Sequence, residues 1–106
     1  MSELNRIELA GEQIKKELEI DSGQFEDRLQ LLKAIESRVE YLLEREPGLL
    51  FSYLYRLDVS EQEIKRVLNI GINPIGNIAL LIYNRQIRRI ETKLKIEQKP
   101  IEGWEW

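Results

Sequence analysis

The sequence predicts an all-α single domain, a bundle of four to five helices. Apolar residues recur at intervals of three and four along most of the chain, which is the spacing of one helix face. Turn signals divide the chain near residues 21–23, 47–48 and 69–73. With 106 residues and 42% hydrophobic content, the chain is long and apolar enough for one modest core. We divide it into a helical bundle domain, residues 1–99, and a C-terminal tail, residues 100–106.

The first expected helix spans residues 4–18, where apolar side chains follow the helical spacing and polar ones lie mostly between them. Gly11 falls on the apolar stripe and weakens this helix. Residues 6–9 also alternate, so a short extended segment remains an alternative there. Residues 21–23, Asp-Ser-Gly, form a turn that supplies a helix cap.

The second expected helix spans residues 25–43 and has the most regular stripe. Pro47 and Gly48 close it. Its apolar positions are Phe25, Leu29, Leu32, Ile35, Val39 and Leu42.

The third expected helix, residues 49–57 (LLFSYLYRL), is apolar on nearly every side. A helix of that kind is surrounded by other helices, so we expect it at the centre of the core. Near its end the sequence changes abruptly from apolar to charged and polar residues. Arg56 and Asp58 are interpreted as a local ion pair or backbone bond at a corner, with a structural rather than a catalytic role.

Ser60 and Glu63 have the spacing of a capping box, which would satisfy free N–H groups at the start of a fourth helix. Val59 and Ile64 stand at the positions of a hydrophobic staple around that box. The fourth helix is therefore expected at about residues 61–68.

Asn73 and Pro74 resemble an N-cap and a first helical residue, and the last helix is expected to end near Gln98. Its second half narrows to a seam that fits a coiled-coil-like contact within the chain or with a second copy, as a homodimer. The seam consists of Leu80, Tyr83, Ile87, Ile90 and Leu94. We expect the second and last helices to pack antiparallel.

Charge is unevenly distributed. Residues 1–46 hold twelve acids and seven bases, whereas residues 74–99 hold six bases and two acids. A basic helix face of this kind could follow phosphates. The candidate nucleic-acid-binding residues are Arg85, Arg88, Arg89, Lys95 and Lys99. Against this, bases near a helix C-terminus complement its dipole, the face could lie against the acidic second helix, and no aromatic residues are interleaved. With a net charge of −3, nucleic acid is the less favoured partner.

The tail, PIEGWEW, places Trp104 and Trp106 close together. Exposed indoles are unusual, so these two residues are candidate partner-binding anchors. The alternative is that the tail folds back into a groove of its own chain. We favour the fold-back, because an intramolecular groove has the advantage of effective concentration.

Catalytic motifs are absent from the sequence. It has no His and no Cys, and it lacks a phosphate-binding glycine loop and known hydrolase signatures. We therefore expect a non-enzymatic protein with no catalytic, cofactor-binding or metal-ligating residues. The N-terminal residues lack the features of an export signal, and the longest apolar run, residues 78–83, is too short for a bilayer. A cytoplasmic location and no membrane association are expected.

The block LLFSYLYRLDVSEQEIKRVL and the later IALLIYNRQIRRIETKLK resemble small uncharacterised bacterial proteins, a domain of unknown function, over roughly residues 25–95. The shared features are the LYRLDVSE corner and the RQIRRIETK helix. The resemblance implies a compact bacterial protein and assigns no activity. It draws attention to polar positions at Arg56, Asp58, Ser60, Arg85, Gln86 and Thr92.

Two functions follow as hypotheses. The first is a small protein-interaction or regulatory domain with an unidentified protein partner. The second is an auxiliary nucleic-acid-binding protein that uses the basic face of the last helix.

Overall fold

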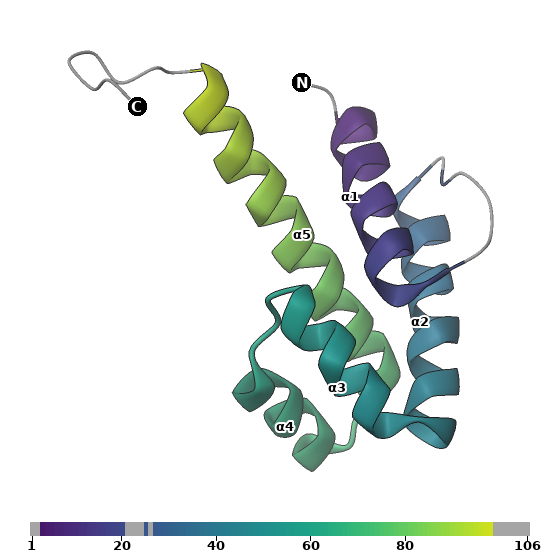
Figure 1. Ribbon diagram of the computed structural model, residues 1–106. Coiled ribbons are helices and arrows are strands. Elements are labelled where there is room, and N and C mark those ends of the chain that lie inside the picture. Colours follow the sequence, from purple (N-terminus) through teal and green to yellow (C-terminus); the bar gives the residue numbers. More distant parts are fainter. Residues whose placement is uncertain (1–2, 21–24, 26, 99–106) are drawn as a thin grey trace.

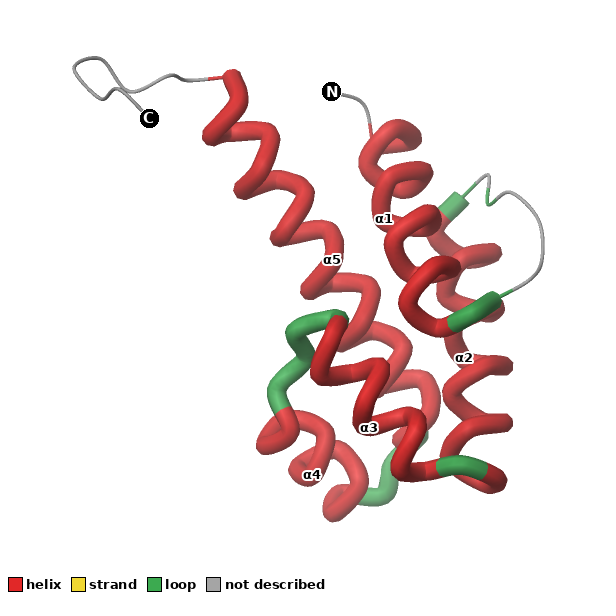
Figure 2. The backbone as a smooth tube through the Cα atoms, viewed as in Figure 1, coloured by secondary structure: helices red, strands yellow, loops and turns green. Residues whose placement is uncertain are grey.

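The computed structural model describes residues 3–20, 25 and 27–98, and within these ranges the chain forms five helices and no strand (Figure 1, Figure 2). The prediction of an all-α single domain is confirmed. Residues 6–9 are helical rather than extended. The helices are α1 (Glu3–Leu18), α2 (Arg28–Arg45), α3 (Pro47–Arg56), α4 (Glu61–Ile70) and α5 (Pro74–Gln98).

The longest helix, α5, is the main packing partner in the bundle. It packs against α1, α2 and α4, while α3 packs against α2 and makes smaller contacts with α1 and α4. Figure 1 shows that α5 runs opposite to both α1 and α2. The expected antiparallel packing of the second and last helices is therefore confirmed.

The expectation that residues 49–57 form the centre of the core is wrong. One face of α3 is buried through Leu50, Tyr53 and Leu54, but Tyr55 is 84% exposed. Leu49 and Phe51 are half-buried against the core, so Tyr55 is the apolar side chain of α3 that faces solvent. The central position belongs to α5 instead.

The start of α2 also differs from the prediction. The helix begins at Arg28, and the side chain of Asp27 caps it by accepting a hydrogen bond from the Gln30 N–H at 2.8 Å. The predicted cap at residues 21–23 lies outside the described residues. Leu29, expected on the buried stripe, is 60% exposed.

Gly11 allows Phe25, three residues before the start of α2, to approach α1 closely. A Cβ atom at Gly11 would lie 3.2 Å from Cδ2 of Phe25, closer than most side-chain contacts. Phe25 therefore contributes apolar contact to the core although it precedes the helix. The glycine that weakens α1 as an isolated helix makes room for a neighbouring ring.

The core extends through all five helices. On α5, the most buried positions are rotated relative to the predicted seam: Leu80, Ile87 and Ile90 are half-buried, and Tyr83 is buried. The structure does not describe the side chain of Leu94. The largest fully buried side chains are Ile14, Leu18, Leu31, Ile35, Leu42, Leu50, Leu54, Leu57, Ile64, Ile78, Ile82 and Gln86.

Candidate functional site

The corner between α3 and α4 is built on a left-handed residue. Asp58 has φ of 60°, and its N–H donates to the Tyr55 carbonyl at 3.1 Å. The next N–H, of Val59, donates to the Leu54 carbonyl at 2.9 Å. These two bonds define a Schellman motif, in which glycine is the usual left-handed residue. An aspartate occupies that position here, and Val59 and Leu54 are both buried beneath it.

Two side chains of α5 bond to this corner, and a third bonds to one of these two. Arg85 forms an ion pair with the Asp58 carboxylate, and its Nε also donates to the Asp58 backbone carbonyl at 3.2 Å. Gln86, which is 1% exposed, donates from Nε2 to the Leu57 carbonyl at 2.6 Å. Arg89 donates to Oε1 of the same Gln86 at 3.1 Å. Carbonyls left free where α3 ends therefore find partners on a helix about 29 residues away in sequence.

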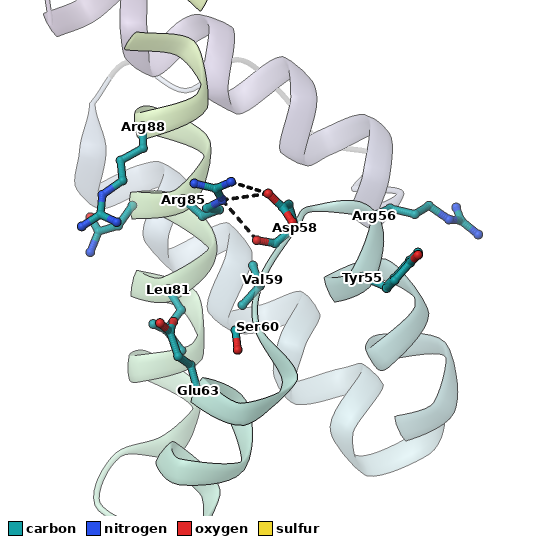
Figure 3. A pocket seen from close by; sticks show the side chains of 10 residues that line it. Tyr55, Arg56, Asp58, Val59, Ser60, Glu63, Leu81, Arg85 and Arg88 are labelled. Carbon is teal, nitrogen blue, oxygen red and sulfur yellow. Dashed lines mark hydrogen bonds and ion pairs between the residues drawn. The ribbon is translucent and has the colours of Figure 1, made fainter. Parts of the chain in front are cut away.

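An open pocket with a volume of about 800 Å³ lies between this corner and α5 (Figure 3). In Figure 3, Arg85 points toward Asp58, whereas Tyr55 and Arg56 point away from it. The neighbouring guanidinium lowers the pKa of Asp58 below its ordinary value, so this carboxylate stays charged in mild acid. The lining residues are Tyr55, Arg56, Asp58, Val59, Ser60, Glu63, Leu81, Asn84, Arg85 and Arg88.

Two predictions about this corner are corrected. Asp58 forms its ion pair with Arg85 rather than with Arg56. The guanidinium of Arg56 lies over the ring of Tyr53, 5.6 Å from its centroid. Ser60 occupies the N-cap position of α4, but its side chain makes no capping hydrogen bond. The predicted capping box is therefore not formed, although Val59 and Ile64 are both buried as expected.

The end of α1 follows the same plan. Glu19 has φ of 55°, and the following Ile20 N–H donates to the Lys15 carbonyl at 3.0 Å. Arg38 of α2 donates from Nε to the Leu18 carbonyl at 2.8 Å. The Glu19 carboxylate accepts a hydrogen bond from the Tyr53 hydroxyl of α3. Two acidic residues in left-handed conformation thus join helix ends to other helices.

The hydrogen bond from Tyr53 to Glu19 raises the pKa of the Tyr53 hydroxyl, and burial and the charge of Glu19 add to this effect. Arg38 lies close enough to oppose the shift in pKa. Tyr53 is 2% exposed, so its ring is packed in the core while its hydroxyl is bonded at the edge.

Arg38 is also one of several arginines that lie over tyrosine rings. The guanidinium carbons of Arg38 and Arg45 lie 5.5 Å and 5.3 Å from the ring centroid of Tyr41, and Arg56 lies over Tyr53. Tyr41 is 45% exposed, and Arg45 and Arg56 are exposed. We call these five residues on α2 and α3 the arginine–tyrosine row. Within the described part of the chain, none of its arginines forms an ion pair with a carboxylate.

The sequence reasoning missed this row. The spacing of Arg38, Tyr41 and Arg45 puts the three on one helix face, and that much could be derived from the sequence. The contribution of Tyr53 and Arg56 could not, because it depends on how α3 packs against α2.

The predicted nucleic-acid-binding residues divide into two groups. Arg85 and Arg89 form intrachain bonds, with Asp58 and Gln86 respectively. Arg88 and Lys95 are exposed.

The remaining predicted candidates, Lys99, Trp104 and Trp106, lie outside the described residues. The basic face of α5 was also predicted to lie against the acidic second helix. Among the described residues, no base of α5 forms an ion pair with an acid of α2, and Arg85 pairs with Asp58 instead.

In the ranges that the structure covers, no three His, Cys, Asp or Glu side chains gather in a way that could hold a metal ion. The helices there are also too short or too polar for any of them to cross a bilayer.

Comparison with known proteins found no matching family model, no matching curated protein and no matching solved structure.

Proposed function

We propose that this chain is a small non-enzymatic protein-interaction domain, and that it binds an acidic segment of a partner protein through the arginine–tyrosine row. The observation that carries the proposal is that the guanidinium groups of Arg38 and Arg45 both lie over the exposed ring of Tyr41. Arginine and tyrosine are enriched at protein interfaces, where a ring supplies contact area at little cost in conformational entropy.

Stacking also prepares the guanidinium groups for an acidic ligand. A guanidinium that lies over a ring can still present N–H groups at its edge, and these match the two oxygens of a carboxylate. Arg45 and Arg56 are exposed and have no carboxylate partner among residues 3–20, 25 and 27–98. The row therefore offers cationic groups that the fold itself does not neutralise.

A short acidic peptide fits this surface better than a long nucleic acid. The row has three arginines, but the chain has a net charge of −3, and residues 1–46 carry an excess of five acids. A polyanion that continues past the row would meet acidic surface, whereas a short segment would not.

The test is a fluorescence polarisation titration of the full chain with three labelled probes: a peptide of alternating Glu and Trp, the same peptide with Lys in place of Glu, and single-stranded oligothymidylate. We expect the acidic peptide to bind and the basic peptide not to bind. Arg45→Glu should weaken acidic-peptide binding by at least about tenfold, a loss of about 1.4 kcal/mol.

Arg66→Glu is the matched control, because Arg66 is an exposed arginine on α4, outside the row. It should leave acidic-peptide binding unchanged. Tighter binding of the oligonucleotide, with an affinity that falls steeply with salt and is insensitive to Arg45→Glu, would contradict the proposal and favour the basic face of α5.

A further inference from the structure

Two features of the chain have complementary chemistry. The arginine–tyrosine row presents Arg45 and Arg56 beside tyrosine rings. The sequence that follows α5 alternates carboxylates with indoles, as Glu102, Gly103, Trp104, Glu105 and Trp106. Carboxylates bind guanidinium groups through two hydrogen bonds, and tryptophan is the best aromatic partner for a cation.

The row lies toward the end of the bundle opposite to the end of α5. The Arg6–Glu91 ion pair, at 3.1 Å, joins the first turns of α1 to the last part of α5, and the two helices are antiparallel (Figure 1). The other end of α1 meets the row, since Leu18 accepts the hydrogen bond from Arg38. Figure 1 shows the C-terminal turns of α5 extending away from this region.

The tryptophans of the same chain could reach the centre of the row only if the tail were almost fully extended. Counting about 1.5 Å per residue along α5, α1 and α2 places Tyr41 about 33 Å from Gln98 along the bundle axis. Trp104 and Trp106 lie six and eight residues beyond Gln98, and extended chains of those lengths span at most about 22 Å and about 29 Å. A contact with Tyr41 within one chain would therefore require the tail to run straight back along the bundle, whereas the tail of a second copy can meet the row without that requirement.

We propose that the arginine–tyrosine row of one chain binds residues 101–106 of a second copy. This inference rests on the proposed function, because it names the acidic segment that the row receives. If each chain gives its segment to the other, the two contacts are related by a twofold axis and the assembly closes as a dimer. The carboxylates of Glu102 and Glu105 pair with arginines, and the indoles stack on the row.

The test uses the full chain in sedimentation equilibrium over a range of protein concentrations. One variant reverses the row (Arg45→Glu with Arg56→Glu), and one reverses the segment (Glu102→Lys with Glu105→Lys). The exposed row arginines make no ion pair with a described carboxylate, so their loss should not unfold the protein. Unchanged melting temperatures of both variants check that the fold is intact.

We expect the unmodified chain to dimerise and each variant alone to remain a monomer. A mixture of the two variants should form a dimer again, because each then meets a partner of opposite charge. Tryptophan emission should shift to the blue with rising concentration of the unmodified chain, since the indoles become covered only in the dimer.

Three outcomes would overturn the inference: a monomer up to the solubility limit, a dimer that persists in the row-reversed variant, or a blue-shifted emission that is independent of concentration. The last would indicate that the tail folds back on its own chain. A monomer that still binds the acidic peptide through Arg45 would overturn only the inference, whereas a monomer that does not bind it would overturn the proposed function as well.

Discussion

Helices α1 and α3 both end at an acidic residue in the left-handed region, Glu19 and Asp58, at a position where glycine is the usual choice. In each case the carbonyl of the preceding leucine accepts a hydrogen bond from a side chain of a longer helix, Arg38 for Leu18 and Gln86 for Leu57. The acidic side chain then binds a third group. The two corners differ in what that group is.

At the α1 end, the acid accepts from Tyr53, which is buried and uncharged. At the α3 end, the acid pairs with the charged Arg85 at an exposed position. The two corners therefore share their backbone geometry, but the pKa of the titrating group is raised at the α1 corner and lowered at the α3 corner. A helix end can therefore use the same left-handed turn with either a neutral or an ionic partner, and burial decides which contact matters more for stability.

The largest expected effect on stability distinguishes Gln86 from Arg38, the side chains that donate to the Leu57 and Leu18 carbonyls. Gln86→Leu removes the only side-chain donor to Leu57 that the described residues supply, and the site is buried, so the free energy of unfolding should fall by about 1–3 kcal/mol. Arg38→Met should cost less, because Arg38 is only half-buried and water can replace it. Chemical denaturation measures both.

Asn84→Ala, at an exposed position on α5, serves as the control and should change the free energy of unfolding by no more than about 0.5 kcal/mol. A Gln86→Leu variant as stable as this control would show that the bond to Leu57 adds nothing to the α3 corner.

The next effect compares the helices that follow the two corners. Asp27→Ala removes the side-chain acceptor at the start of α2 and should cost about 1 kcal/mol. Ser60→Ala at the start of α4 should cost much less, because the Ser60 side chain makes no capping bond. Thermal unfolding of the two variants checks the order, and equal losses would argue against it.

A moderate effect is expected at the α1 corner. Tyr53→Phe keeps the buried ring and removes the hydroxyl that donates to Glu19, so the free energy of unfolding at neutral pH should fall by about 0.5–1.5 kcal/mol. Tyr55→Phe is a matched control, because Tyr55 is 84% exposed and should tolerate the change. Urea denaturation of both variants gives the comparison.

The smallest effect is expected at the α3 corner. Asp58→Gly loses the exposed ion pair with Arg85 but places glycine in a conformation that it adopts without strain. These contributions oppose each other, so the melting temperature should hardly change. Asp58→Ala loses the pair and keeps the strain, and it should melt below Asp58→Gly. The reverse order would mean that the left-handed conformation costs nothing here.

Much of the fold follows from the sequence because it depends on local chemistry. The bounds of α4 and α5 come from nearby turn residues, and Pro74 begins α5 as expected. Contacts between distant residues could not be derived in this way. Neither the pairing of Arg85 with Asp58 nor the approach of Tyr53 to Glu19 can be anticipated without knowing how the helices cross.

The errors have a physical cause as well. The apolar sequence of α3 suggested that it is surrounded, but a helix of ten residues at the side of the bundle can leave Tyr55 in solvent. Single exposed hydrophobic residues are normal on protein surfaces, so apolar content alone does not fix a helix at the centre. The arginine–tyrosine row was missed for a related reason, since it spans two helices.

The pH dependence of stability is the most direct test of whether the α1 corner has a neutral bond and the α3 corner an ionic one. The pKa of Tyr53 is raised in the folded state, so its contribution is complete below its ordinary pKa of 10.0 and is lost as the pH rises through the raised value. The pKa of Asp58 is lowered, so its contribution is present above its ordinary pKa of 3.8 and is lost as the pH falls through the lowered value.

The measurement is the free energy of unfolding from pH 2 to pH 11 for the unmodified chain, Tyr53→Phe and Asp58→Asn. We expect the advantage of the unmodified chain over Tyr53→Phe to be constant near neutrality and to shrink above about pH 10. Its advantage over Asp58→Asn should shrink only in acid, below about pH 4. If both differences were independent of pH, or if the acid and alkaline responses were exchanged, the assignment of a neutral bond to the α1 corner and an ionic bond to the α3 corner would be contradicted.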